Sequence, residues 1–113
     1  VVKGLEKEQS WETMIPLLQD LLNHSRQQLN RNEMDRLYDK LEQALEATKD
    51  EDRLVRTCHS HLEIKRAIGD VEGEERLLSK LGRLHHRRGD KEMANQLYQD
   101  TLRLRNSMER AAY

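Results

Sequence analysis

The amino-acid sequence predicts an all-α protein built from repeated helical hairpins, and three observations lead to this prediction. Leu, Glu, Arg, Lys and Gln dominate the chain, and these residues lose little free energy on entering a helix. Five Gly and one Pro are too few for the many turns of an all-β protein. Identical residues also recur forty positions apart: Arg36 and Arg76, Leu37 and Leu77, Lys40 and Lys80, Leu41 and Leu81, Asp50 and Asp90, Leu62 and Leu102. Such a period is typical of units that must stack on one another to bury their apolar faces.

The composition limits both the core and the classes of function. With 113 residues, 36% of them charged, and a mean hydropathy of -1.00, the chain 1–113 is expected to form one domain with thin apolar layers. A formal net charge of -1 gives no overall field that would attract nucleic acid or an anionic membrane. Cys58 is the one cysteine, which fits a reducing compartment, and no apolar run is long enough to span a membrane. We therefore expect a cytoplasmic, intracellular protein, and the ends of the sequence suggest a fragment of a larger one.

A lone first helix is predicted within residues 10–30. Its apolar residues are spaced three and four apart, as in an amphipathic helix: Trp11, Met14, Ile15, Leu17, Leu18, Leu21, Leu22 and Leu29. Ser10 can cap the start of this helix. Pro16 predicts either a start near Thr13 or a kink, because proline is costly inside a helix and tolerated in its first turn.

A first hairpin is predicted over residues 32–69. Asn32 is expected to cap its first helix, which ends near Thr48 and carries an apolar stripe of Met34, Leu37, Tyr38, Leu41 and Leu45. Asp50 is expected to cap the second helix, and Gly69 to end it. The connection is short, so the two helices should be antiparallel.

A second hairpin is predicted over residues 70–112. Asp70 opens its first helix and Gly89 ends it, with Leu77, Leu78, Leu81 and Leu84 as the apolar stripe. Asp90 caps a final helix of roughly 22 residues, or about 33 Å at 1.5 Å per residue. We expect about five helices in all, stacked as a right-handed solenoid with a concave and a convex face.

Residues 75–106 contain Leu81, Gly82, Ala94 and Tyr98, and on these residues the segment resembles a tetratricopeptide repeat. In that family, a Leu-Gly pair on the first helix lets the second helix approach closely, and a small and an aromatic residue on the second helix fill the gap. Leu81, Gly82, Ala94 and Tyr98 occupy these positions at the family's spacing. The forty-residue period is similar to the long repeats of kinesin light chains and of the Pins/LGN polarity adaptors.

The earlier hairpin matches the family less well. Glu42 stands in place of the Gly, Leu54 in place of the Ala and Cys58 in place of the aromatic residue. We therefore expect looser packing there, with Cys58 as a small buried apolar residue.

No residue pattern indicates an enzyme or a metal centre. The sequence has no nucleophile elbow and no glycine-rich phosphate loop. His59 and His61 are two apart and point in different directions on a helix, and no Cys-x-x-Cys or His-x-x-x-His spacing is present. We expect a non-catalytic chain with no cofactor and no metal ligands.

The resemblance implies a concave groove lined by the helix arc opposite the leucines of the second hairpin. That arc carries Arg76, Ser79, Arg83, His86 and Arg87, and the matching arc of the first hairpin adds Asp39 and Gln43 as candidate peptide-binding residues. Arginine binds carboxylates through paired hydrogen bonds, which suits an acidic peptide or a chain end. The alternative is a solvated face whose cations favour the helix dipole.

We therefore predict a protein–protein interaction module, an adaptor or scaffold that presents a groove to a peptide. One alternative is self-assembly into a homo-oligomer through the apolar first helix, with Trp11 as an anchor. A weaker alternative is RNA binding, which rests only on the local basic arc and is disfavoured by the neutral overall charge. Membrane binding is not expected.

Overall fold

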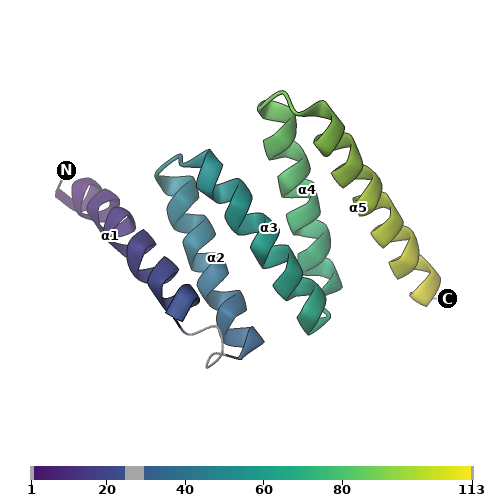
Figure 1. Cartoon of the computed structure of the whole chain (residues 1–113), viewed down its shortest axis with the longest axis horizontal. Coiled ribbons are helices and arrows are strands. Elements are labelled where there is room, and N and C mark those ends of the chain that lie inside the picture. The colour runs from purple at the N-terminus through teal and green to yellow at the C-terminus, as the bar shows by residue number, and fades with distance from the viewer. Residues whose placement is uncertain (1, 25–29, 113) are drawn as a thin grey trace. The chain divides into compact units, whose positions relative to one another are not determined.

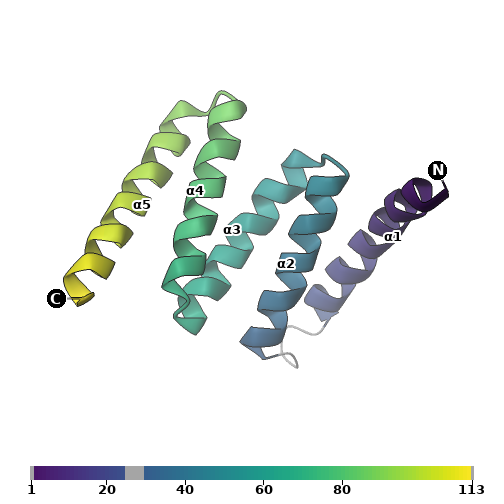
Figure 2. The ribbon, with the colours of Figure 1, turned by 180° about the vertical axis from the view of Figure 1, so that it is seen from behind.

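The computed structural model describes residues 2–24 and 30–112 of the chain. These residues form five α-helices, which are α1 (Val2–His24), α2 (Arg31–Ala47), α3 (Glu51–Ile68), α4 (Val71–Arg87) and α5 (Lys91–Ala112) (Figures 1 and 2). No strand occurs in the described part, so the predicted all-α class is confirmed. None of the helices described here has both the length and the apolar character needed to cross a membrane.

The contacts divide the chain into two compact units, Val1–Ile64 and Lys65–Tyr113. In unit 1, α1 packs along α2, and α1, α2 and α3 alternate in direction; in unit 2, α4 and α5 form an antiparallel hairpin (Figures 1 and 2). The right-handed stacking of all the hairpins stays a prediction.

The helix α1 differs most from its sequence prediction. It begins at Val2, so Ser10 lies inside the helix and does not cap it, and of the two alternatives for Pro16 the start near Thr13 is wrong. Pro16 lies inside the helix too, although an interior proline costs roughly 3 kcal/mol. Burial of the apolar side chains of Ile15, Leu18 and Leu22 offsets this cost. Leu29, the last apolar residue of the predicted stripe, lies outside the described residues.

The forty-residue period of the sequence reappears in the helix bounds. Both α2 and α4 have 17 residues, and they begin at Arg31 and Val71. The helices α3 and α5 begin at Glu51 and Lys91, again forty residues apart. The two helix–turn–helix repeats therefore have the same length from the start of the first helix to the start of the second helix.

Three turns of one design join α2 to α3, α3 to α4 and α4 to α5. Each contains a residue in the left-handed region: Lys49 with φ 59°, Gly69 with φ 74° and Gly89 with φ 82°. In each turn the backbone N–H of the residue that follows the left-handed residue donates to the carbonyl oxygen five residues before it, at 2.9–3.0 Å. This hydrogen bond closes the C-terminus of the helix and turns the chain back sharply.

Each of these turns ends in an aspartate that caps the following helix, as predicted. Asp50, Asp70 and Asp90 are twenty residues apart, and each carboxylate accepts a hydrogen bond from the N–H three residues on, at 3.3, 2.9 and 3.3 Å. The predicted Asn32 cap of α2 is wrong, because Asn30 performs this role and accepts from the Glu33 N–H at 2.8 Å. Asn30 has an extended backbone and a Glu three residues later, the arrangement that favours an N-cap.

Unit 2 has the close helix packing that the sequence predicted. The leucine stripe of α4 is buried, as is Ala94 of α5. A Cβ atom added to Gly82 would lie 2.7 Å from Cε1 of the Tyr98 ring, so only glycine leaves space for that ring. Leu102 of α5, by contrast, is 57% exposed.

Unit 1 buries apolar residues from all three of its helices. They are Ile15, Leu18, Leu22, Met34, Tyr38, Leu41, Ala44, Leu45, Leu54, Val55, Cys58 and Leu62. Cys58 is fully buried, as expected of a small apolar residue. Glu42 and His61 are also buried, and they form the polar cluster described below.

We expect Lys49→Gly to stabilise the protein by roughly 0.5–1 kcal/mol, because a residue with a Cβ atom is strained at positive φ. Urea unfolding measures this change as a higher midpoint with an unchanged slope. The reverse variant, Gly89→Lys, places the same strain in the matching turn and should lower the midpoint. A midpoint that falls in Lys49→Gly would contradict the strain argument.

Candidate functional site

One face of α4 carries the residues predicted to bind a peptide. Arg76, Arg83, His86 and Arg87 are exposed, and Ser79 is half-buried, on the side of the helix opposite the buried leucines. Their spacing of three and four residues places them in one row along the helix. We call these five residues the basic face.

The positive charge is concentrated toward the C-terminal end of α4. Glu72 and Glu74 lie in the first turn, whereas His85, His86 and Arg87 lie in the last turn. This order complements the helix dipole, which favours anions at the N-terminus and cations at the C-terminus. The basic residues at this end of α4 therefore stabilise the helix.

Lys65 and Asp70 support the start of α4. The Gly73 N–H, the Lys65 ammonium and, more weakly, the nearby Arg76 charge hold the pKa of Asp70 below its ordinary value. The Lys65 Nζ atom lies 2.9 Å from Asp70 Oδ2, and Lys65 itself is 6% exposed. The cap is thus fixed by a backbone hydrogen bond and an ion pair.

Asp39 and Gln43, the other two predicted site residues, lie on α2 in unit 1. Both side chains are exposed. A groove that they share with the basic face stays a prediction.

Two depressions lie elsewhere on the surface. One, of about 400 Å³ in unit 1, has Leu22, Tyr38 and Leu41 among its lining residues and Arg53 and Arg56 beside them. Another, of about 300 Å³ in unit 2, lies between α4 and α5 with Arg66, Glu74 and Arg103. Neither depression is lined by residues of the basic face.

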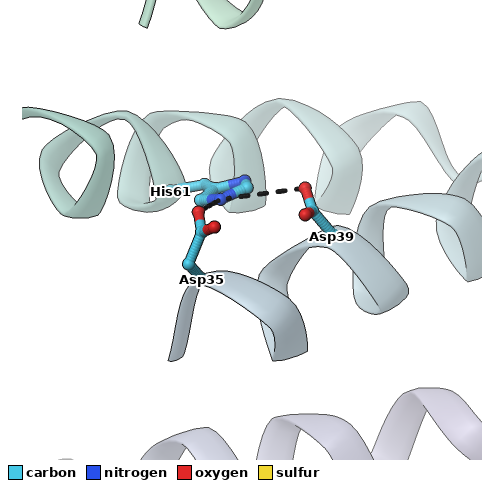
Figure 3. A group of neighbouring side chains, drawn as sticks. All are labelled: Asp35, Asp39 and His61. Carbon is cyan, nitrogen blue, oxygen red and sulfur yellow. Dashed lines mark hydrogen bonds and ion pairs between the residues drawn. The ribbon is translucent and has the colours of Figure 1, made fainter. Parts of the chain in front are cut away.

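A buried histidine in unit 1 is surrounded by acidic side chains, a cluster that the sequence did not predict. His61 of α3 is 1% exposed at its side chain, and its Nε2 lies 2.6 Å from Asp35 Oδ1 and 3.9 Å from Asp39 Oδ1 (Figure 3). Its Nδ1 is hydrogen-bonded to the buried Glu42 carboxylate. The Tyr38 ring stacks on the imidazole with centroids 5.3 Å apart and planes at 18°. The imidazole is therefore held on both nitrogens and on one of its faces.

The acidic side chains determine the charge state of His61. Burial by itself would lower the pKa of His61, but the hydrogen bond and charge of Glu42, together with Asp35 and Asp39, raise it above its ordinary value. With the carboxylates ionised, the imidazolium form is favoured. A cation held among three carboxylates links α2 to α3.

This cluster joins residues of two helices. Spacing along one helix predicts that His59 and His61 point in different directions, but it could not show which residues of α2 face His61. The sequence did contain one signal for this cluster, because Asp35 and Asp39 are four residues apart and therefore lie on one face of a helix.

Residues 77–112 match the family model of the tetratricopeptide repeat. The matched segment covers most of α4 and all of α5, and it contains every residue of the basic face except Arg76. No curated protein and no solved structure matched the chain. Residues 77–112 are therefore similar to a tetratricopeptide repeat, a motif that generally mediates protein–protein interactions and is typically non-catalytic.

We expect His61→Leu to lower the free energy of unfolding by roughly 3–5 kcal/mol, because Glu42 keeps a buried charge and loses its cation. The double variant His61→Leu/Glu42→Leu removes that charge and should be more stable than His61→Leu alone. Urea unfolding of both variants at neutral pH measures the difference. A double variant no more stable than the single one would mean that the buried pair does not determine stability here.

Proposed function

We propose that this chain is a non-catalytic adaptor or scaffold module whose basic face binds an acidic peptide segment of a partner protein. The observation that carries the proposal is the row of exposed Arg76, Arg83 and Arg87 on one face of a helix that lies largely within the segment similar to a tetratricopeptide repeat. The neutral overall charge supports local rather than general attraction of acidic partners. A cytoplasmic setting suits a chain whose single cysteine cannot form an internal disulfide.

The small free energy of a single exposed ion pair argues for a bound peptide with several carboxylates. An exposed ion pair contributes only about 0–1 kcal/mol, so a single carboxylate would bind weakly. Several pairs formed by one chain add up, and paired hydrogen bonds from arginine strengthen each of them. A segment with repeated Asp or Glu is therefore the favoured guest.

The spacing of the arginines points to an extended guest. Arg83 and Arg87 are four residues apart, or about 6 Å along the helix axis, and Arg76 and Arg87 are separated by about 16–17 Å. Alternate residues of an extended chain point to the same side and are about 6.6–6.8 Å apart, which is close to the Arg83–Arg87 spacing. Acidic residues at two alternate positions of an extended segment would thus reach Arg83 and Arg87 together.

We expect Arg83→Glu/Arg87→Glu to weaken capture of such a peptide at least tenfold. The probe is a fluorescent peptide of alternating Glu and Ser, and anisotropy at two salt concentrations measures its Kd. Wild-type binding should weaken as salt rises, because the contacts are charge pairs near the surface. A Lys–Ser peptide of equal length should not bind.

The matched control is Arg103→Glu/Arg110→Glu, which makes the same change in net charge at exposed positions of α5. It should reduce binding much less than the α4 variant. Equal losses in both variants, or unchanged capture by Arg83→Glu/Arg87→Glu, would contradict the assignment of the basic face. Circular dichroism melting shows whether each variant remains folded.

Self-assembly is a second candidate because α1 exposes large apolar side chains. Leu17 is 58% exposed and Leu21 is 48% exposed, and these two residues are one helical turn apart. Trp11, the anchor considered in the sequence, is half-buried. A second copy of the chain could cover this stripe.

If copies associate through α1, Leu17→Gln/Leu21→Gln should shift the protein to the monomer. Sedimentation velocity over a hundredfold range of protein concentration measures the change. A wild-type chain that is monomeric throughout this range would exclude this candidate and would leave peptide binding by α4 untouched.

A further inference from the structure

We propose that Asp35, Asp39 and His61 form a binding site for one divalent transition-metal ion, with Zn²⁺ as the favoured ion. One imidazole nitrogen and two carboxylate oxygens, all within 4.8 Å of one another, converge from α2 and α3 (Figure 3). Nitrogen and oxygen donors of these types bind Zn²⁺, and three protein ligands leave a coordination position for water. The inference concerns unit 1 and is independent of the peptide-binding proposal for α4.

The distances between the donor atoms suit an ion of this size. Zn²⁺ bonds of about 2.0–2.1 Å in a tetrahedron place neighbouring ligand atoms about 3.3–3.4 Å apart. The Nε2 atom of His61 lies 2.6 Å from the Asp35 oxygen and 3.9 Å from the Asp39 oxygen, so the two spacings bracket that value. All three donor atoms lie within 4.8 Å of one another, so rotation of the aspartate side chains toward a shared ion would complete the geometry.

Glu42 gives the histidine the support that metal-binding imidazoles usually have. Its carboxylate holds Nδ1, on the opposite side of the ring from the candidate metal position. A carboxylate in this place fixes the ring orientation and makes the other nitrogen a better ligand. The stacked Tyr38 ring restricts rotation of the imidazole further. Because the imidazole is already held in place, it loses little conformational entropy when the ion binds.

The site is buried on one side and open on the other. The side chain of His61 is 1% exposed and that of Asp35 is 18% exposed, whereas that of Asp39 is 55% exposed. An ion can therefore enter past Asp39 and reach the buried nitrogen. On binding, the proton between Nε2 and the carboxylates leaves to solvent, so the metal–nitrogen bond replaces an N–H bond.

The test is titration of the whole chain with Zn²⁺ by calorimetry and with Co²⁺ by visible absorption, whose band reports coordination geometry. We expect one ion per chain, with affinity at least tenfold weaker in Asp39→Asn and in Asp35→Asn. Asp39 is the main test position because its side chain is 55% exposed, so the substitution leaves the packed core intact. Glu42→Gln should weaken binding by about 10–100-fold without removing a ligand.

Exposed imidazoles are the competing explanation for any metal uptake, and His86→Gln controls for them. This variant should bind the ion as the wild type does. Absence of saturable binding at 1 mM Zn²⁺ would overturn the proposal, and so would equal affinity in Asp39→Asn and the wild type. Loss of binding in His86→Gln alone would assign the ion to the surface of α4 and overturn the proposal as well.

Discussion

The turns between helices are the constraint on which the rest of the structure depends. Each contains a left-handed residue followed by an aspartate, at positions 49–50, 69–70 and 89–90. The left-handed residue ends one helix by closing its last carbonyls, and the aspartate starts the next by accepting from its third N–H. With so short a connection, α2 and α3 must run antiparallel, and so must α4 and α5. The leucine stripes are then brought face to face by geometry before any specific packing is required.

The two hairpins share this type of turn but differ in the contacts between their helices. In unit 2, Gly82 of α4 leaves space for the Tyr98 ring of α5. The positions forty residues earlier hold Glu42 and Cys58, and a carboxylate bonded to buried His61 takes the place of the glycine–tyrosine contact. Packed apolar side chains carry no charge, whereas a buried carboxylate needs a cation to neutralise its charge. In unit 2 the positions that match Asp39, Glu42 and His61 hold Ser79, Gly82 and Thr101, so the same charged cluster cannot form there.

The candidate surfaces differ in how far the sequence could reveal them. The basic face lies on a single helix, so the period of 3.6 residues was enough to place Arg76, Arg83 and Arg87 on the exposed side of α4. The cluster around His61 draws its carboxylates from α2, and its contacts span 19 and 26 residues along the chain. Such contacts depend on the rotation and register of two packed helices, which local spacing does not determine.

The sequence by itself determined the helical class, the forty-residue period, the three aspartate caps and the buried leucines of α4. All of these follow from local rules, since capping, turn formation and amphipathic spacing act within a few residues. Only the tertiary structure decided that Pro16 lies inside α1 and that His61 meets Asp35, Asp39 and Glu42. In each case the outcome depends on free energy gained by packing or pairing with another segment, which local preference cannot measure.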